Sequence, residues 1–244
     1  MNNITFVIQD EFLLTNEDLH PQPISNFIPK WYADMDISKP KSNSLKDFID
    51  TVFNVKSCPS FVEVYKDGFV IPAPHDFYIQ YDKATKNWAW QTPIKYKDFS
   101  VIEDGEQVTV HGNEQMLDYL PNNPYNKIFK FNLPYKVITD KGISIRQLPI
   151  PYAYNKKWEA MYGIFRSDKV HEVNIQIGYK TDDKELLIKQ GEPLCVYAPF
   201  KREKFNLKIK NTNNIEANLI KKNLSKLYSS FNKNFKNLDY YLDA

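Results

Sequence analysis

The sequence predicts an all-β protein with a short helix in its N-terminal part and a long helix at its C-terminal end. Three observations favour this class. Apolar and polar residues alternate in many short runs, with the period of a strand that buries one face. Aromatic residues make up 15% of the 244 residues, and large flat side chains suit the faces of sheets. The 7 glycines lie at or near the predicted strand ends, where turns require them.

The first predicted segment is an extended N-terminal arm over residues 1–43. Alternating apolar residues predict a strand at 4–8. Beyond this strand the arm has no sustained period and carries repeated prolines, which fix φ and remove hydrogen-bond donors. We therefore expect the arm to cross the body or a neighbouring subunit. Its prolines are Pro21, Pro23, Pro29 and Pro40.

The second predicted segment, residues 44–210, is a β-rich body. Ser44 as an N-cap, followed by apolar residues at helical spacing, predicts a short helix at 44–54. A helical turn is expected over 59–67 and another over 113–120. Between and after them strands predominate, and we place these at 69–71, 77–81, 88–90, 99–101, 108–110, 129–131, 135–137, 143–145, 173–179, 186–188 and 194–198.

The third predicted segment, residues 211–244, is an amphipathic C-terminal helix. Apolar residues recur at spacings of three and four, with Lys and Asn between them, so the helix should cover residues 214–237. Asn213 can cap its N-terminus. A single helix with one apolar stripe must bury that stripe, either on the body or on copies of itself.

Charge and composition exclude several classes of function. A net charge of +2 argues against general nucleic-acid binding, which requires a strongly basic face. No apolar run is long enough for a signal peptide or a membrane span, so we expect a cytoplasmic protein without a membrane partner. Cys58 and Cys195 lie far apart in unrelated contexts; a disulfide remains open, but two reduced thiols are favoured.

Two motifs stand within residues 162–200: Gly163-Ile164-Phe165-Arg166-Ser167-Asp168-Lys169-Val170-His171-Glu172, and the segment 188–196 around Gly191. Their spacing matches the patterns G-[VI]-[IL]-D-S-D-Y-x-G-E and I-x-x-G-D. In these motifs the segment resembles the dUTPase and dCTP deaminase family, whose strands form a β-clip fold. The resemblance implies a β-clip-like fold and a homotrimer with sites shared between subunits. Arg166 stands where the family has the aspartate that activates water, and the P-R-S-G motif for the triphosphate is absent from the sequence.

A wider pattern covers more of the chain. Residues 58–61, 68–72 and 199–203 resemble a family of tailed phages and bacteria that has no assigned activity. This resemblance implies a phage origin, with the protein in the cytoplasm of an infected or host bacterial cell or associated with the virion.

The turn that follows Phe165 holds the candidate site residues. The resemblance makes Arg166, Ser167, Asp168 and His171 candidates for ligand binding, and Asp168 and Glu172 candidates for catalysis. One interpretation is a pocket in which Arg166 meets an anion or a nucleotide phosphate. The other is a salt-bridged surface turn, of the kind that contributes little to stability.

Other clusters favour structural roles. The four histidines lack the spacing of a metal site. A set of His75, Asp76, His111 and Glu114 can be drawn, but ordinary hydrogen-bonded roles are favoured and we expect no metal. Trp88 and Trp90 could form an aromatic platform for a base or sugar, although core packing is the preferred interpretation. The basic run at 201–204 is interpreted as a solvated strand exit.

Three functions remain open from the sequence. The first is a non-catalytic β-clip protein, acting as an oligomeric assembly or accessory component or in interaction with host proteins. The second is a nucleotide-binding protein that sequesters its ligand in a degenerate dUTPase-like pocket. The third is a nucleotide hydrolase or deaminase with relocated catalytic groups. No cofactor is expected, and Mg²⁺ would be needed only with a bound nucleoside triphosphate.

Overall fold

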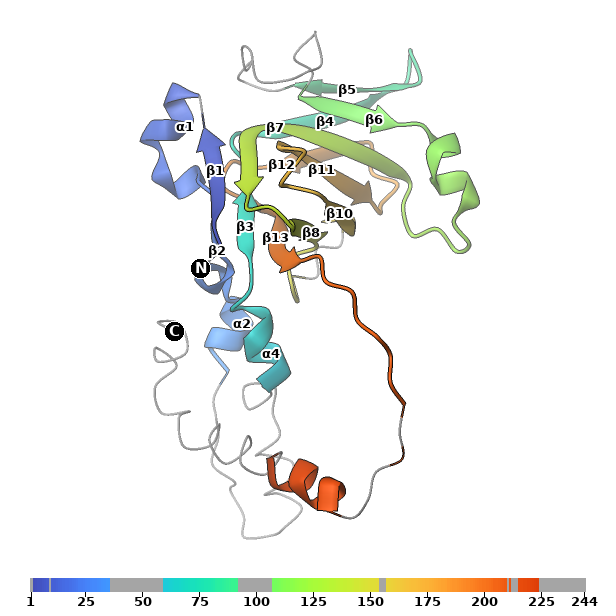
Figure 1. The fold of residues 1–244 in the computed structure, drawn as a ribbon. Helices are drawn as coiled ribbons and strands as arrows, with labels where there is room; N and C mark the ends of the chain where they lie inside the picture. Colours follow the sequence, from blue (N-terminus) through green and yellow to red (C-terminus); the bar gives the residue numbers. More distant parts are fainter. Residues whose placement is uncertain are drawn as a thin grey trace. The chain divides into compact units, whose positions relative to one another are not determined.

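The computed structural model describes residues 2–8, 10–35, 59–91, 107–153, 157–209, 211 and 215–223. Antiparallel strands dominate this part of the chain (Figure 1). The contacts divide the chain into a β-sheet unit, formed by Met1–Ile24 and Asp67–Arg202, and a second unit, formed by Ser25–Lys66 and Glu203–Ala244. Each unit thus combines two separate stretches of sequence, whereas the sequence analysis divided the chain into three consecutive segments.

The first sheet of the β-sheet unit is organised around one long strand. Its order is β1-β7-β11-β9, and β6 also pairs with β7. Strand β7 runs unbroken where two strands were predicted. Pro134 does not interrupt it, because the ladder with β1 begins at Tyr135 and the ladder with β11 is irregular near Glu172, so its missing N–H costs no hydrogen bond. The strands are β1 (Ile4–Ile8), β6 (Val108–His111), β7 (Lys127–Thr139), β9 (Trp158–Ala160) and β11 (Glu172–Tyr179).

Two further sheets complete this unit. The second has the order β10-β8-β13-β3-β2 and the third β12-β4-β5. The strands predicted at 77–81 and 88–90 are confirmed as β4 and β5, which pair with each other antiparallel. The predicted strand at 99–101 lies outside the described residues. The strands are β2 (Gln22–Pro23), β3 (Phe69–Pro72), β4 (Phe77–Asp82), β5 (Asn87–Gln91), β8 (Ile143–Leu148), β10 (Gly163–Phe165), β12 (Glu185–Ile188) and β13 (Pro193–Lys201).

The core lies where the alternation of the sequence places it. In β11 the predicted inward residues Val173, Ile175, Ile177 and Tyr179 are all buried. Trp88 packs edge-on against Phe129, with ring centroids 5.2 Å apart, and also against Tyr179. The indole therefore contributes to the core, as the preferred interpretation held, and does not form an exposed platform.

The described part of the predicted N-terminal arm is not extended throughout. After β1 the chain forms short helical turns, because Asp10 caps the first of them by accepting from the N–H of Leu13 at 2.9 Å. Leu13 is fully buried, and the hydroxyl of Tyr135 donates to the carbonyl oxygen of Leu19 at 2.7 Å, which fixes this stretch on the β-sheet unit. The turns are α1 (Glu11–Thr15), η1 (Glu17–Leu19), η2 (Ile24–Phe27) and α2 (Lys30–Ala33).

In the second unit, aromatic rings join α2 to α4 (Pro59–Val64). Tyr32 stacks on Phe61 with centroids 4.5 Å apart, and Trp31 meets Phe61 edge-on at 5.7 Å. Residues 203–209 have neither helical nor strand structure, and 215–223 are helical. The predicted helix at 44–54 lies outside the described residues, as does the remainder of the one predicted at 214–237.

Short 3-10 turns, η4 (Asn113–Gln115) and η5 (Leu117–Tyr119), follow β6. They occupy the stretch 113–120 for which a helical turn was predicted. No helix in the described part of the chain is long and apolar enough to cross a membrane.

Candidate functional site

Of the predicted site residues, Arg166, Ser167, Asp168 and His171 lie on a compact turn between β10 and β11, and Glu172 begins β11. The N–H groups of Lys169 and Val170 both donate to the carbonyl oxygen of Arg166, at 2.9 and 2.8 Å. Ser167 is fully buried, and its hydroxyl lies 2.7 Å from that of Thr139 at the end of β7. The turn is thus closed by its own backbone and attached through Ser167 to the first sheet.

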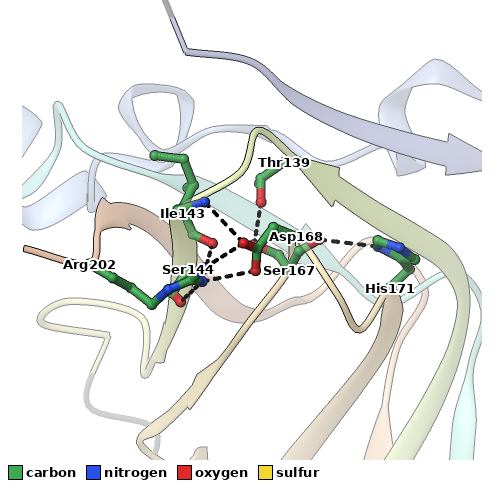
Figure 2. A network of polar contacts seen from close by, with 8 residues as sticks. Thr139, Ile143, Ser144, Ser167, Asp168, His171 and Arg202 are labelled. Carbon is green, nitrogen blue, oxygen red and sulfur yellow. Dashed lines mark hydrogen bonds and ion pairs between the residues drawn. The ribbon is translucent and has the colours of Figure 1, made fainter.

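Asp168 points inward from this turn and forms an ion pair with the guanidinium of Arg202 (Figure 2). Its side chain is 5% exposed and receives both guanidinium nitrogens of Arg202: Nη1 donates to Oδ1 at 2.9 Å, and Nη2 to Oδ2. The N–H of Gly142 donates to Oδ2 at 3.0 Å. The bond from Arg202, and then that from Gly142, hold the pKa of Asp168 well below its usual range. A carboxylate stabilised in this way is a poor proton acceptor, so it is unsuited to act as a general base.

Arg202 is the central donor of this network. Its Nη1 also donates to the carbonyl oxygen of Ile143 at 2.7 Å and to the hydroxyl of Ser144 at 2.8 Å, both on β8. The solvated strand exit predicted for residues 201–204 is therefore wrong at Arg202. No local pattern indicates this role, because Arg202 follows the last strand and its acidic partner lies 34 positions earlier in the sequence.

Gly142 connects the network to the β7–β8 hairpin. Its φ of +88° lies in the left-handed region that favours glycine. While its N–H donates to Asp168, its carbonyl oxygen accepts from the N–H of Arg202 at 2.9 Å. These bonds join three segments at one point: the turn after β10, the β7–β8 hairpin and the end of β13. This arrangement stabilises the fold and leaves Asp168 no free oxygen for chemistry with a ligand.

His171 and Glu172 also have structural partners. Nδ1 of His171 lies 3.1 Å from the carbonyl oxygens of both Val137 and Ser167. Because both partners are acceptors, Nδ1 carries the proton. Glu172 forms an ion pair with Lys136 at 3.7 Å, with both side chains one-third exposed, so this pair contributes little.

Arg166 differs from the other candidate site residues because it is exposed. The structure thus brings Ser167, Asp168 and His171 into contacts that build the turn and directs Arg166 to the surface. Within the described residues its guanidinium forms no hydrogen bond or ion pair with another side chain.

A cavity of about 260 Å³ lies elsewhere, between β9 and the start of β13. Trp158 and Leu194 contribute apolar surface, while Glu159 and Glu192 supply carboxylates. Glu159 already accepts from the hydroxyl of Tyr125 at 2.9 Å and pairs with Lys180 at 2.7 Å. None of the candidate site residues predicted from the sequence lines this cavity.

Both carboxylates of the cavity wall accept hydrogen bonds from neighbouring groups. Burial, followed by the bond to Glu159, raises the pKa of Tyr125 to about 12, so this phenol stays protonated at neutral pH. Glu192 accepts from the backbone N–H of Lys189 at 3.1 Å. Both carboxylates of the cavity are therefore already engaged.

The histidines do not assemble a metal site within the described residues. His75 is 2% exposed, and its Nδ1 lies 2.8 Å from the carbonyl oxygen of Asp76. Nδ1 of His111 lies 2.6 Å from Oε1 of Gln115. Burial lowers the pKa of His75, which favours the neutral ring.

No known protein-family model matches this chain, and no curated protein matches it. Its function is therefore argued from the geometry above and from the surface that the chain exposes.

Proposed function

We propose that this protein is a non-catalytic, oligomeric protein with β-clip-like strands that serves as an assembly or accessory component. A single observation carries the proposal. Large apolar side chains are exposed in two described stretches, 205–209 and 215–220: Phe205, Leu207 and Ile209 are 87%, 87% and 88% exposed, and Ile215, Leu219 and Ile220 are 73%, 54% and 63% exposed. A run of exposed apolar residues on a stable protein marks an interaction surface.

The turn at Asp168 supports a structural role for the segment that resembles the hydrolytic family. Its carboxylate is bound by Arg202 and Gly142, and the position of the water-activating aspartate is taken by the exposed Arg166. The resemblance to phage proteins supports a role in an infected cell or in the virion. The resemblance to the β-clip family supports a homotrimer as the assembled form.

Light scattering during size-exclusion chromatography tests the oligomer. At micromolar concentration we expect three times the chain mass of 28.7 kDa. A variant ending at Arg202 lacks the whole exposed run and should elute as a monomer. A monodisperse monomer for the full chain would refute the proposal.

Nucleotide binding is tested separately by thermal unfolding with deoxynucleoside triphosphates, monophosphates and cyclic nucleotides, with and without Mg²⁺. A ligand at about 100 times its Kd adds roughly 2.7 kcal/mol. In a chain of this size that raises the unfolding midpoint by several degrees, at about 2 to 4 °C per kcal/mol. We expect no shift. A shift that Arg166→Ala removes would instead favour the nucleotide-binding function.

A further inference from the structure

Residues 203–209 have the sequence of a strand but lack a strand's partners within the described part of the chain. Phe205, Leu207 and Ile209 alternate with Asn206 and Lys208, the pattern of a strand with one apolar face. The preceding residue, Arg202, is fixed to the β7–β8 hairpin through its N–H and its guanidinium. After it, no hydrogen bond is found for 203–209 among the residues that the structure describes, and the three apolar side chains are almost fully exposed. We call residues 203–209 the C-terminal arm.

Strand β10 has one edge without a partner strand in the described part of the chain. It is the edge strand of the second sheet, and within the described residues its only strand partner is β8. Ile164 is 69% exposed, and Tyr162, which precedes the strand, is 78% exposed. An unpaired edge with exposed apolar residues favours pairing with another strand unless it is covered.

We propose that the C-terminal arm of one copy of this chain adds to β10 of a second copy as an antiparallel strand. The inference rests on the proposed oligomeric function and names the contact that builds the oligomer. Every strand pair in the described part of the molecule is antiparallel, which favours that direction. Strand addition satisfies the backbone of both the arm and the edge.

The side chains select the register. With Leu207 opposite Ile164, Ile209 lies opposite Tyr162, and Phe205 lies opposite Arg166. All three pairs lie on one face, because both segments alternate with period two. The register thus covers the exposed apolar residues of the edge with those of the arm.

Arg166 gains a partner in this register. Its exposed guanidinium would lie beside the ring of Phe205, and a cation over an aromatic face is attracted to it. The same sheet already contains such a pair, since the guanidinium carbon of Arg146 lies 4.4 Å from the centroid of Phe200. Arg166 is therefore assigned to the contact between copies.

Chemical cross-linking tests the pairing. Ile164→Cys is placed in a chain with an enlarged affinity tag and Leu207→Cys in an untagged chain, both carrying Cys58→Ser, and the two are co-expressed and treated with a short bis-maleimide. The remaining native thiol, Cys195, is fully buried. We expect a cross-linked product that contains one tagged and one untagged chain. Two controls should lower its yield at least fivefold: Asn206→Cys in place of Leu207→Cys, on the opposite face of the arm, and Leu187→Cys in place of Ile164→Cys, on another sheet edge.

Three results would overturn the inference, and they separate it from the proposed function. Trimers that form without this cross-link would refute the pairing and leave the oligomeric function standing. A chain that carries both Ile164→Cys and Leu207→Cys and cross-links only within itself would show that the arm pairs with β10 of its own copy. A chain that remains monomeric at every concentration would refute both proposals.

Discussion

Replacing Leu207 with serine should weaken self-association in proportion to the apolar surface that the arm buries. Leu207 is 87% exposed in the single chain, so nearly all of its side chain is available for burial. Burying a leucine contributes about 1.5 to 3 kcal/mol. Because each 1.4 kcal/mol is a tenfold change in Kd, every contact between copies should weaken roughly ten- to hundredfold. Sedimentation equilibrium over a range of concentrations measures this directly.

Leu187→Ser is the matched control. Leu187 is 48% exposed and lies on β12, an edge strand of the third sheet. It loses the same chemical group at a sheet edge that the proposed register does not use, so its self-association should not change. Both substitutions lie on the surface and should alter the free energy of unfolding by no more than about 0.5 kcal/mol. Equal weakening by the two variants, or none by Leu207→Ser, would refute the reasoning.

Four further predictions follow. Gly142→Ala should lower the free energy of unfolding in urea by about 1 to 2 kcal/mol, because φ is +88°, although a Cβ there would meet nothing within 4 Å. Gly68→Ala should lower it further, because φ is +123° and a Cβ would lie 3.0 Å from a carbonyl oxygen of β13. Equal losses for the two variants would contradict this prediction. Asp168 has a lowered pKa, so its stabilisation is present above its usual value of 3.8 and is lost as the pH falls below it; Asp168→Asn should flatten that part of an acid titration followed by fluorescence, and an unchanged slope would count against the network. The lowered pKa of His75 means that the unfolded chain binds more protons below pH 6.5, so stability should fall as the pH drops through that value, an effect that His75→Gln should remove in urea titrations at pH 7 and 5. Arg166→Ala should weaken self-association about two- to fivefold in the same sedimentation assay, and an unchanged Kd would exclude its contact with Phe205.

Much of the sheet structure follows from alternation alone. The period of two along β11 predicts which side chains are buried, because a strand against a core must alternate. Alternation cannot show that β7 continues through Pro134, since this depends on where the ladders of the neighbouring strands begin and end. Nor does the repeated proline of residues 10–35 predict the helical turns found there, which depend on local caps such as Asp10.

The sequence predicts the turn that holds the candidate residues, but not the contacts of those residues. The spacing around residues 163–172 correctly selects a turn between two strands. Whether Asp168 serves chemistry or structure depends on its partners, Arg202 and Gly142, which lie far away in the sequence. Residue type and spacing carry no information about such long-range hydrogen bonds, so the sequence alone does not predict this network.

Two residues of the turn after β10, two positions apart, point in opposite directions and have different roles in the proposed assembly. Asp168 points inward and fixes the residue from which the C-terminal arm departs, because its partner Arg202 is the last residue before the arm. Arg166 points outward from the same turn, next to the edge that we assign to the arm of another copy. A change at Asp168 should therefore alter the point from which the arm leaves its own body, and a change at Arg166 should alter only the reception of a neighbour's arm. Mixing the two variants with the unaltered chain separates these effects, because the first is a defect of the copy that gives its arm and the second of the copy that receives it.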